Sequence, residues 1–183
     1  YEKIELVYRA NGVKCELLEL GCYGIKSSEL ARSAASVLHI TPYRSYPSGV
    51  TASASKRREY MHWADTGNNF IIEDDFESEF TLSSKPEETL FALSKKENVV
   101  YLNTFSKTIA SSIRIGYMVL PEALIDLFNE KVGFYSCTVP LFEQYVIAEF
   151  INSGDFERHI NRVRRKKRKL AEQQNRVNQD KPI

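Results

Sequence analysis

The sequence predicts an α/β fold built on a mainly parallel sheet with helices on both faces. Three short apolar runs, at residues 37–41, 70–72 and 99–103, have the continuous hydrophobic character of strands that are covered on both faces. Segments with apolar residues at helical spacing lie between and after these runs. Strands that alternate with helices favour parallel pairing, because parallel neighbours need a long crossover connection.

The first third of the chain predicts a helix, a strand and two further helices. Residues 1–10 carry apolar side chains at helical spacing, and Gly12 supplies a left-handed stop. Residues 13–20 alternate and are rich in apolar residues, so we expect a strand. Short helices are expected over residues 28–35, after a serine cap, and over residues 53–64.

The second half of the chain predicts mostly helices. We expect a short helix over residues 86–93 and a strand over residues 115–120. Pro121 suits the first position of a following helix. Residues 140–152 are apolar on most sides and predict a buried helix, whereas residues 155–177 predict one long amphipathic helix.

Length and composition indicate a globular protein with one sizeable core and at most two small domains. The chain has 183 residues, of which 43% are hydrophobic. No apolar run approaches the ~20 residues of a membrane span, and no leader opens the chain. The three cysteines have no metal-ligand spacing, and their odd number argues against a disulfide framework, so we expect a cytoplasmic protein. Because the first residue is Tyr1 and not Met, we expect a piece of a longer protein.

The net charge of +1 hides a basic segment near the end of the chain. From Asp155 onward there are ten Lys and Arg residues against four Asp and Glu residues, and residues 164–169 form a continuous basic run. Clustered basic residues can bind nucleic acid directly. On an amphipathic helix, however, long basic side chains often only cover an apolar face, and that interpretation is favoured here.

Polar clusters follow the three predicted parallel strands, at residues 42–49, 73–79 and 104–114. Ligands of open α/β sheets bind outside the carboxyl ends of the strands, so these clusters predict a site. Lys107 lies in the third cluster, and an amine held at the end of a buried strand can attack a carbonyl as a free base. The alternative is a solvated lysine in a loop, which is the common state of lysines.

Three motifs, in this order and spacing, resemble a known family. They are residues 71–80 (IIEDDFESEF), residues 101–108 (YLNTFSKT) and residues 114–117 (RIGY). Together they are similar to fold type I pyridoxal-phosphate proteins, and more narrowly to MocR/GabR-type regulators. In those regulators a GntR-type winged-helix domain is fused to an aminotransferase-like domain. The resemblance extends over nearly the whole chain and implies part of the large domain of that fold.

The resemblance implies a role for each of five residues. Lys107 would hold pyridoxal 5'-phosphate as an internal aldimine and move a proton in a catalytic relative. Asp74 would pair with the pyridinium nitrogen, which makes the ring an electron sink. Thr104 and Arg114 would contact the phosphate, and Phe76 would lie beside the cofactor. Taken singly, Asp74 could instead be a cap or a solvated carboxylate, and Arg114 half of a surface ion pair.

Two positions depart from the family pattern. Phe76 stands where the family often has a tyrosine that reaches the ring oxygen of the cofactor, and Tyr46 stands where true aminotransferases usually have an asparagine. A phenyl ring cannot donate that hydrogen bond. Both departures favour a regulator that senses an effector over an enzyme, although turnover stays open. The alternative is an active aminotransferase of the aminoadipate or kynurenine type.

The resemblance also implies an organisation and partners. Residues 1–154 would form the cofactor-binding portion, and residues 155–183 a long basic helix that leads toward a C-terminal small domain absent from this sequence. An amino compound would be the effector or substrate. DNA would be contacted only through a winged-helix domain that is not in this sequence, no membrane is implied, and a homodimer is expected.

Overall fold

The computed structural model describes residues 2–76, 78 and 88–179 of the chain. The chain divides into two compact units, which are described separately. The first unit contains residues up to 76 together with residues 88–103 and 117–125. The second contains residues 104–116 and the residues from 126 onward. A domain boundary between residues 154 and 155 stays a prediction.

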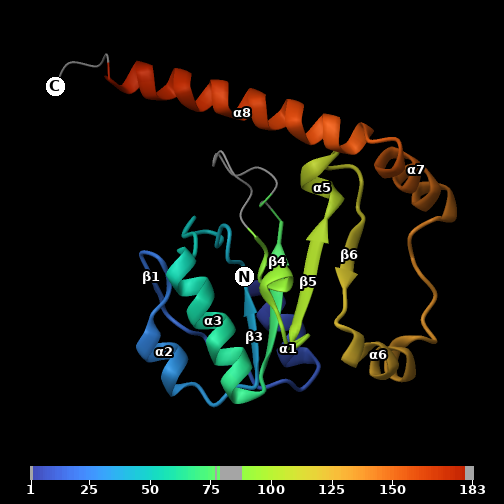
Figure 1. The fold of residues 1–183 in the computed structure, drawn as a ribbon. Coiled ribbons are helices and arrows are strands. Elements are labelled where there is room, and N and C mark those ends of the chain that lie inside the picture. The colour runs from blue at the N-terminus through green and yellow to red at the C-terminus, as the bar shows by residue number, and fades with distance from the viewer. Residues whose placement is uncertain (1, 77, 79–87, 180–183) are drawn as a thin grey trace. The chain divides into compact units, whose positions relative to one another are not determined.

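A four-stranded sheet organises the first unit, with the strand order β3-β4-β5-β6. These strands are β3 (Val37–Ile40), β4 (Phe70–Asp75), β5 (Val99–Thr104) and β6 (Gly116–Val119). Strand β4 pairs in parallel with both β3 and β5, and the arrow of β6 points the opposite way (Figure 1). The predicted α/β class with a mainly parallel sheet is confirmed.

The core lies where one face of this sheet packs against helix α3 (Ala54–Gly67). The register places Leu38 of β3 beside Ile71 of β4, and Ile71 beside Val99 of β5, so one apolar row crosses three strands. The helix contributes Tyr60, Met61 and Ala64 to the same cluster. Removing these side chains from water is the main stabilising contribution of this face.

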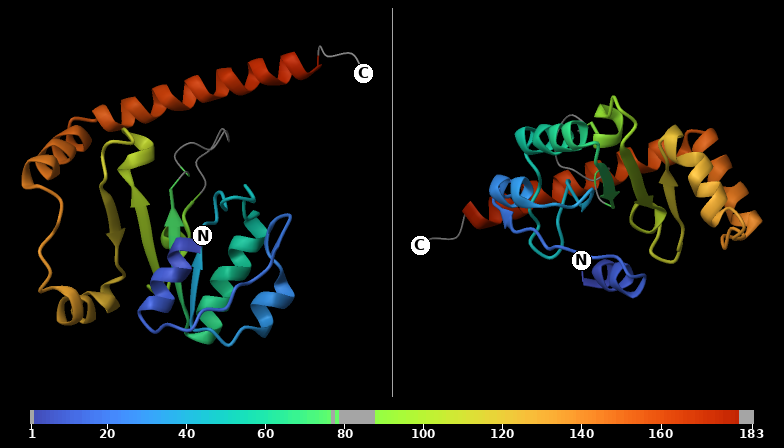
Figure 2. Two further views of the ribbon diagram at one scale, coloured as in Figure 1. Left: turned by 180° about the vertical axis from the view of Figure 1, so that it is seen from behind. Right: turned by 90° about the horizontal axis from the view of Figure 1, so that it is seen from below.

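Helices lie on both faces of the sheet, as predicted: α3 covers one face and α1 (Glu2–Ala10) lies on the other (Figure 2). Helix α3 begins after Ser53, whose side chain accepts a hydrogen bond from the Lys56 amide, and ends at Asn68 in a left-handed conformation. After α1, Gly12 takes φ +77°, which explains the predicted stop.

The strand predicted over residues 13–20 is wrong. Only Leu20–Gly21 (β1) is a strand, and it pairs antiparallel with β2 (Gly24–Ile25) in a separate two-stranded sheet. The apolar side chains of Val13 and Leu17 are exposed, so alternation alone did not establish a pairing partner. Helix α2 (Ser27–Arg32) follows and is shorter than predicted. The predicted serine cap is wrong, because the N-cap residue is Lys26 and no side chain caps the helix.

Three further boundaries differ from the predictions. Strand β4 continues through Asp75 and does not end at residue 72, so the acidic cluster begins inside the strand. Helix α4 (Leu90–Leu93) begins after its cap Thr89, whereas residues 86 and 87 of the predicted helix lie outside the described residues. Pro121 caps a short 3-10 turn, η2 (Glu122–Leu124), and is not itself the first helical residue.

Most of the second unit is helical. Its helices are α5 (Phe105–Thr108), α6 (Ile125–Val132, which begins at the last residue of the first unit), α7 (Leu141–Asn152) and α8 (Asp155–Gln179). The long amphipathic helix is confirmed as α8. The expected burial of the helix over residues 140–152 is wrong, because α7 buries none of its residues and Phe142 is 77% exposed.

Two general features limit the kinds of site in the described residues. No helix among residues 2–76, 78 and 88–179 has both the length and the apolar character needed to cross a bilayer. Within the same ranges, no group of three or more His, Cys, Asp and Glu side chains is arranged to hold a metal ion.

Candidate functional site

The carboxyl end of β4 carries three consecutive acidic residues that point to alternate faces of the sheet. Glu73 and Asp75 are buried, whereas the Asp74 side chain keeps 23% of its surface exposed. Successive side chains of a strand face opposite ways, so Asp74 lies on the face away from the α3 core. Asp74 is therefore the member of the cluster that a ligand can reach.

Glu73 has a structural role. Its carboxylate accepts hydrogen bonds from the Tyr43 hydroxyl at 2.7 Å and from the Leu90 and Phe91 amides at 2.8 and 2.9 Å. These amides open helix α4, whose first N–H groups have no partner inside the helix. Burial raises the pKa of Glu73, and the same burial raises the pKa of Tyr43. The pair joins the end of β4 to the loop after β3 and to α4.

Asp75 is held in a similar way by β5. The Tyr101 hydroxyl donates to Asp75 Oδ2 at 2.8 Å, and the Asn103 side-chain amide donates to the Tyr101 oxygen at 2.7 Å. Asp75 and Asn103 are also register partners in the parallel pair, and burial raises the pKa of Tyr101. These bonds fix the backbone on both sides of Asp74. Phe76, half-buried, is the first residue after the strand.

Asp74 has a specific neighbour that lies outside the three sequence motifs. Nε2 of His39, on strand β3, lies 3.6 Å from Asp74 Oδ2. Nδ1 of the same ring shares a hydrogen bond of 2.6 Å with the Tyr8 hydroxyl of α1. Neither residue belongs to a motif, and only the parallel register of β3 with β4 could have suggested His39.

The lysine segment is a tight turn within the second unit. Thr104 caps α5, because its hydroxyl oxygen accepts from the Ser106 amide at 3.2 Å, while the hydroxyl donates to the Ile115 carbonyl at 3.1 Å. The Phe105 amide also donates to Ile115 O, at 2.9 Å. Residues 109–115 therefore fold back onto the start of α5.

This turn brings three of the predicted residues into one short segment, Thr104, Lys107 and Arg114. Lys107 lies in the single turn of α5, and both Lys107 and Arg114 are exposed. Arg114 Nη1 donates to Ser106 Oγ at 3.3 Å, and Ser106 Oγ donates to the Ile113 carbonyl at 2.5 Å. Ser106 thus orients Arg114, a role that the sequence did not suggest.

The start of α8 packs against the same segment. His159 Nε2 donates to the Thr108 carbonyl at 2.8 Å, since a carbonyl oxygen can only accept. The ring of Phe156 meets the ring of Phe105 edge-on, with centroids 5.9 Å apart. Thr108 itself is buried, so the residue after Lys107 is held from two sides.

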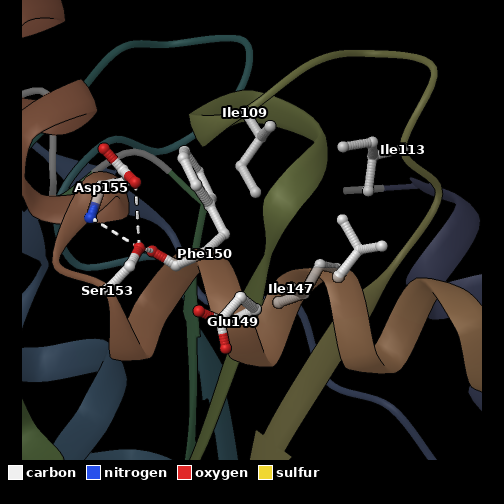
Figure 3. Close-up of a pocket in the computed structure, with 8 residues that line it drawn as sticks. Ile109, Ile113, Ile147, Glu149, Phe150, Ser153 and Asp155 are labelled. Atoms are coloured by element: carbon white, nitrogen blue, oxygen red, sulfur yellow. Dashed lines mark hydrogen bonds between the residues drawn. The ribbon is translucent and has the colours of Figure 1, made fainter.

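The described part of the second unit also contains a cavity of about 450 Å³. Ile109 and Ile113 line it from the turn after α5, and Ile147 and Phe150 line it from α7 (Figure 3). The Ser153 hydroxyl donates to Asp155 Oδ2 at one end of the lining. None of the five predicted site residues lines this cavity, and its walls are mainly apolar.

The residues predicted from the motifs thus fall into two groups, and each group lies in its own unit. Asp74 and Phe76 belong to the first unit, whereas Thr104, Lys107 and Arg114 belong to the second. Strands β4 and β5 end at the same edge of the sheet, and Asn103 is followed directly by Thr104.

Comparison with known proteins gives a family. The model of the class I and II aminotransferases matches residues 28–179. The helix-turn-helix-type transcriptional regulator YdeL of Bacillus subtilis is 32% identical over 93% of this chain, which spans 38% of that protein. The rhizopine catabolism regulatory protein MocR of Rhizobium meliloti is 30% identical over 84% of the chain, which spans 31% of it.

Solved structures give the same result. The α-aminoadipate aminotransferase LysN of Thermus thermophilus aligns with the whole chain at a TM-score of 0.81 and 25% identity, and the chain covers 49% of it. The kynurenine aminotransferase of Pyrococcus horikoshii aligns with 81% of the chain at a TM-score of 0.72 and 29% identity, and the chain covers 39% of it. The chain therefore belongs to the class I and II aminotransferase family.

Proposed function

We propose that this chain is the pyridoxal-phosphate-binding, effector-sensing portion of a transcriptional regulator of the MocR type. The observation that carries the proposal is the identity of 30 to 32% with proteins named as regulators, over 84 to 93% of the chain. The chain spans only 31 to 38% of those relatives. DNA binding is therefore assigned to a winged-helix domain outside this sequence. The homodimer stays an expectation from the family resemblance.

The chemistry of the donor set fits pyridoxal phosphate. Asp74 offers an anion for the ring nitrogen, Lys107 an amine for the aldehyde, and Arg114 a guanidinium fork for the phosphate. The Thr104 hydroxyl can turn from the Ile115 carbonyl to a phosphate oxygen. When bound, the cofactor supplies an electron-withdrawing ring to the carbon that carries the substrate amine.

The residues of this chain would then divide the work. Asp74 would hold a proton at the ring nitrogen of the cofactor. Lys107 Nζ would bind the aldehyde carbon of the cofactor covalently, and as a free amine it would take up or return a proton. Arg114, oriented by Ser106, would fix the phosphate end. Phe76 offers no hydroxyl to the ring, and this absence supports sensing over rapid turnover.

A second function has its own support. The aligned structures include an α-aminoadipate and a kynurenine aminotransferase. The alternative is therefore an enzyme that transfers an amino group between an amino acid and a keto acid. The two functions differ in what an amino compound does to the protein: it changes DNA affinity in a regulator, and it is consumed in an enzyme.

One experiment separates the two functions. The complete protein, loaded with pyridoxal phosphate, is mixed with the DNA upstream of its own gene and with a panel of amino acids, and DNA affinity is measured by fluorescence anisotropy. We expect at least one amino acid to change this affinity, with no more than about one keto acid formed per protein when 2-oxoglutarate is present. Many turnovers per protein without DNA binding would establish the enzyme instead.

Arg114→Ala tests the phosphate contact. Hydrogen bonds to charged groups contribute about 1.5–3 kcal/mol, so we expect cofactor affinity to fall about 10- to 100-fold, measured by titration with pyridoxal phosphate. Ser106→Ala should weaken affinity less, because Ser106 only orients the guanidinium. The control is Arg165→Ala, which removes an exposed guanidinium from the basic run of α8. An equal loss in the control would mean that general charge, and not Arg114, attracts the phosphate.

A further inference from the structure

Three polar side chains from three different elements are connected by successive contacts on the face of the sheet opposite the α3 core. Tyr8 comes from α1, His39 from β3 and Asp74 from β4. The Tyr8 oxygen is 2.6 Å from His39 Nδ1, and His39 Nε2 is 3.6 Å from Asp74 Oδ2. The rings of Tyr8 and His39 also meet edge-on, with centroids 5.7 Å apart.

The sheet register explains why these residues meet. His39 pairs with Ile72, and the next pair along the strands is Ile40 with Glu73. Ile40 and Glu73 are buried, so their neighbours His39 and Asp74 both face the side of α1. The His39 and Asp74 side chains keep only 18% and 23% of their surface exposed, so water screens their contact weakly.

The geometry selects one arrangement of protons. Within the described residues, His39 Nε2 is buried and makes no hydrogen bond, and 3.6 Å is beyond hydrogen-bond length but within ionic contact. An Nε2 lone pair facing a carboxylate would be repelled, whereas an N–H group there is attracted. Burial, and then the nearby Cys15 and Asp74, raise the pKa of Tyr8, so its phenol keeps its proton at neutral pH.

We propose that Tyr8 and His39 are positioning residues for Asp74. Tyr8 donates its hydroxyl proton to His39 Nδ1, which leaves the ring proton on Nε2, directed toward the Asp74 carboxylate. The N–H group faces the carboxylate oxygen and limits the rotation of the Asp74 side chain. The inference rests on the proposed function, in which Asp74 meets the cofactor's ring nitrogen, and it names the residues that prepare Asp74 for that contact.

The first test needs no cofactor. The complete protein is labelled with 15N only in its histidines, and the two ring nitrogen shifts of His39 are measured, with His39→Gln identifying the signals. In the wild type we expect the neutral ring to carry its proton on Nε2. In Tyr8→Phe we expect a mixture of the two neutral tautomers, with the proton on Nε2 in one and on Nδ1 in the other. A proton on Nδ1 in the wild type, or no change in Tyr8→Phe, would overturn the inference.

The second test measures affinity for pyridoxal phosphate and the absorption maximum of the bound cofactor. Loss of a partner that orients a metal ligand costs about tenfold or more in affinity, and we expect about tenfold from His39→Leu. Tyr8→Phe removes one neutral hydrogen bond and should cost about threefold. His39→Gln keeps an N–H donor, so it should retain most of the affinity that His39→Leu loses, and only His39→Leu should clearly shift the absorption maximum.

Matched controls separate this inference from the proposed function. His62→Leu and Tyr23→Phe make the same chemical changes at exposed positions of the same unit and should change nothing. If the wild type takes up no pyridoxal phosphate, the proposed function fails, while the ring-proton measurement still decides the inference. If the wild type binds and His39→Leu binds equally well with an unchanged spectrum, the inference alone fails. Circular dichroism confirms that each variant is folded.

Discussion

Lys107→Ala in the complete protein is expected to abolish covalent retention of pyridoxal phosphate. Lys107 is exposed on α5, where an amine can meet an aldehyde carbon, and alanine offers no nucleophile. Borohydride reduction followed by intact mass measurement should show the added cofactor mass on the wild type and none on the variant. Peptide mapping should place the modification on the peptide that contains Lys107.

The control for this experiment is Lys95→Ala, which removes another exposed lysine and should keep the added mass. Arg114 and Asp74 should still bind the cofactor non-covalently in Lys107→Ala. Because this binding is reversible, dialysis should remove the cofactor from the variant. Full borohydride labelling of Lys107→Ala would assign the covalent attachment to another amine. In that case the proposed cofactor role of the α5 segment would be wrong.

Glu73→Ala is expected to produce the largest loss of stability. The substitution leaves the Tyr43 hydroxyl and the Leu90 and Phe91 amides without their acceptor. Each buried donor that loses its acceptor costs about 1–3 kcal/mol, and three donors lose theirs. The free energy of unfolding should therefore fall by at least about 3 kcal/mol. Urea denaturation of the complete protein measures this loss. Amide hydrogen exchange at Leu90 and Phe91 should accelerate locally, because α4 loses its anchor.

Glu19→Ala is the matched control, since it breaks only an exposed ion pair with Lys26, and such pairs contribute little. If Glu73→Ala and Glu19→Ala have equal effects, the carboxylate does not anchor α4.

The pH dependence of Glu73 has a definite sign. Burial raises its pKa above the ordinary 4.5, against the opposing hydrogen bonds from Tyr43, Leu90 and Phe91. The folded state therefore binds the proton more tightly than the unfolded state, so this carboxyl contributes less to stability as the pH rises above 4.5. Glu73→Gln cannot titrate. The stability difference, wild type minus Glu73→Gln, should therefore decrease as the pH rises above 4.5.

The strands and the main helix of the first unit were predictable because their signals are local. The apolar runs at β3, β4 and β5 and the helical pattern over residues 53–64 lie in the sequence itself. Residues 13–20 failed because alternation indicates a strand only when a neighbour pairs with it. The burial expected of α7 failed for a related reason: apolar composition indicates a need for a partner surface and does not supply one.

The site could be predicted only as far as its motifs. Asp74, Lys107 and Arg114 are identified by the resemblance of their motifs to the family, and they stay predictions as cofactor ligands. The residues that hold them, His39 beside Asp74 and Ser106 beside Arg114, depend on sheet register and on a turn that folds back on itself. Such contacts between elements leave no periodic trace in one sequence. If the sequence had predicted that β4 continues to Asp75, the alternation of side chains along the strand would have distinguished Asp74 from the buried Glu73 and Asp75.

Helix α8 is attached at its first two turns to the segment that contains Lys107. Its 25 residues rise about 37 Å at 1.5 Å each, and its first two turns are attached to the segment through His159 and Phe156. Over this length, a rigid tilt of about 5° at the attached end displaces the other end by about 3 Å. The carbonyl that His159 holds belongs to Thr108, the residue directly after Lys107. A small rearrangement around Lys107 would therefore be expected to move the far end of α8 by more than the rearrangement itself.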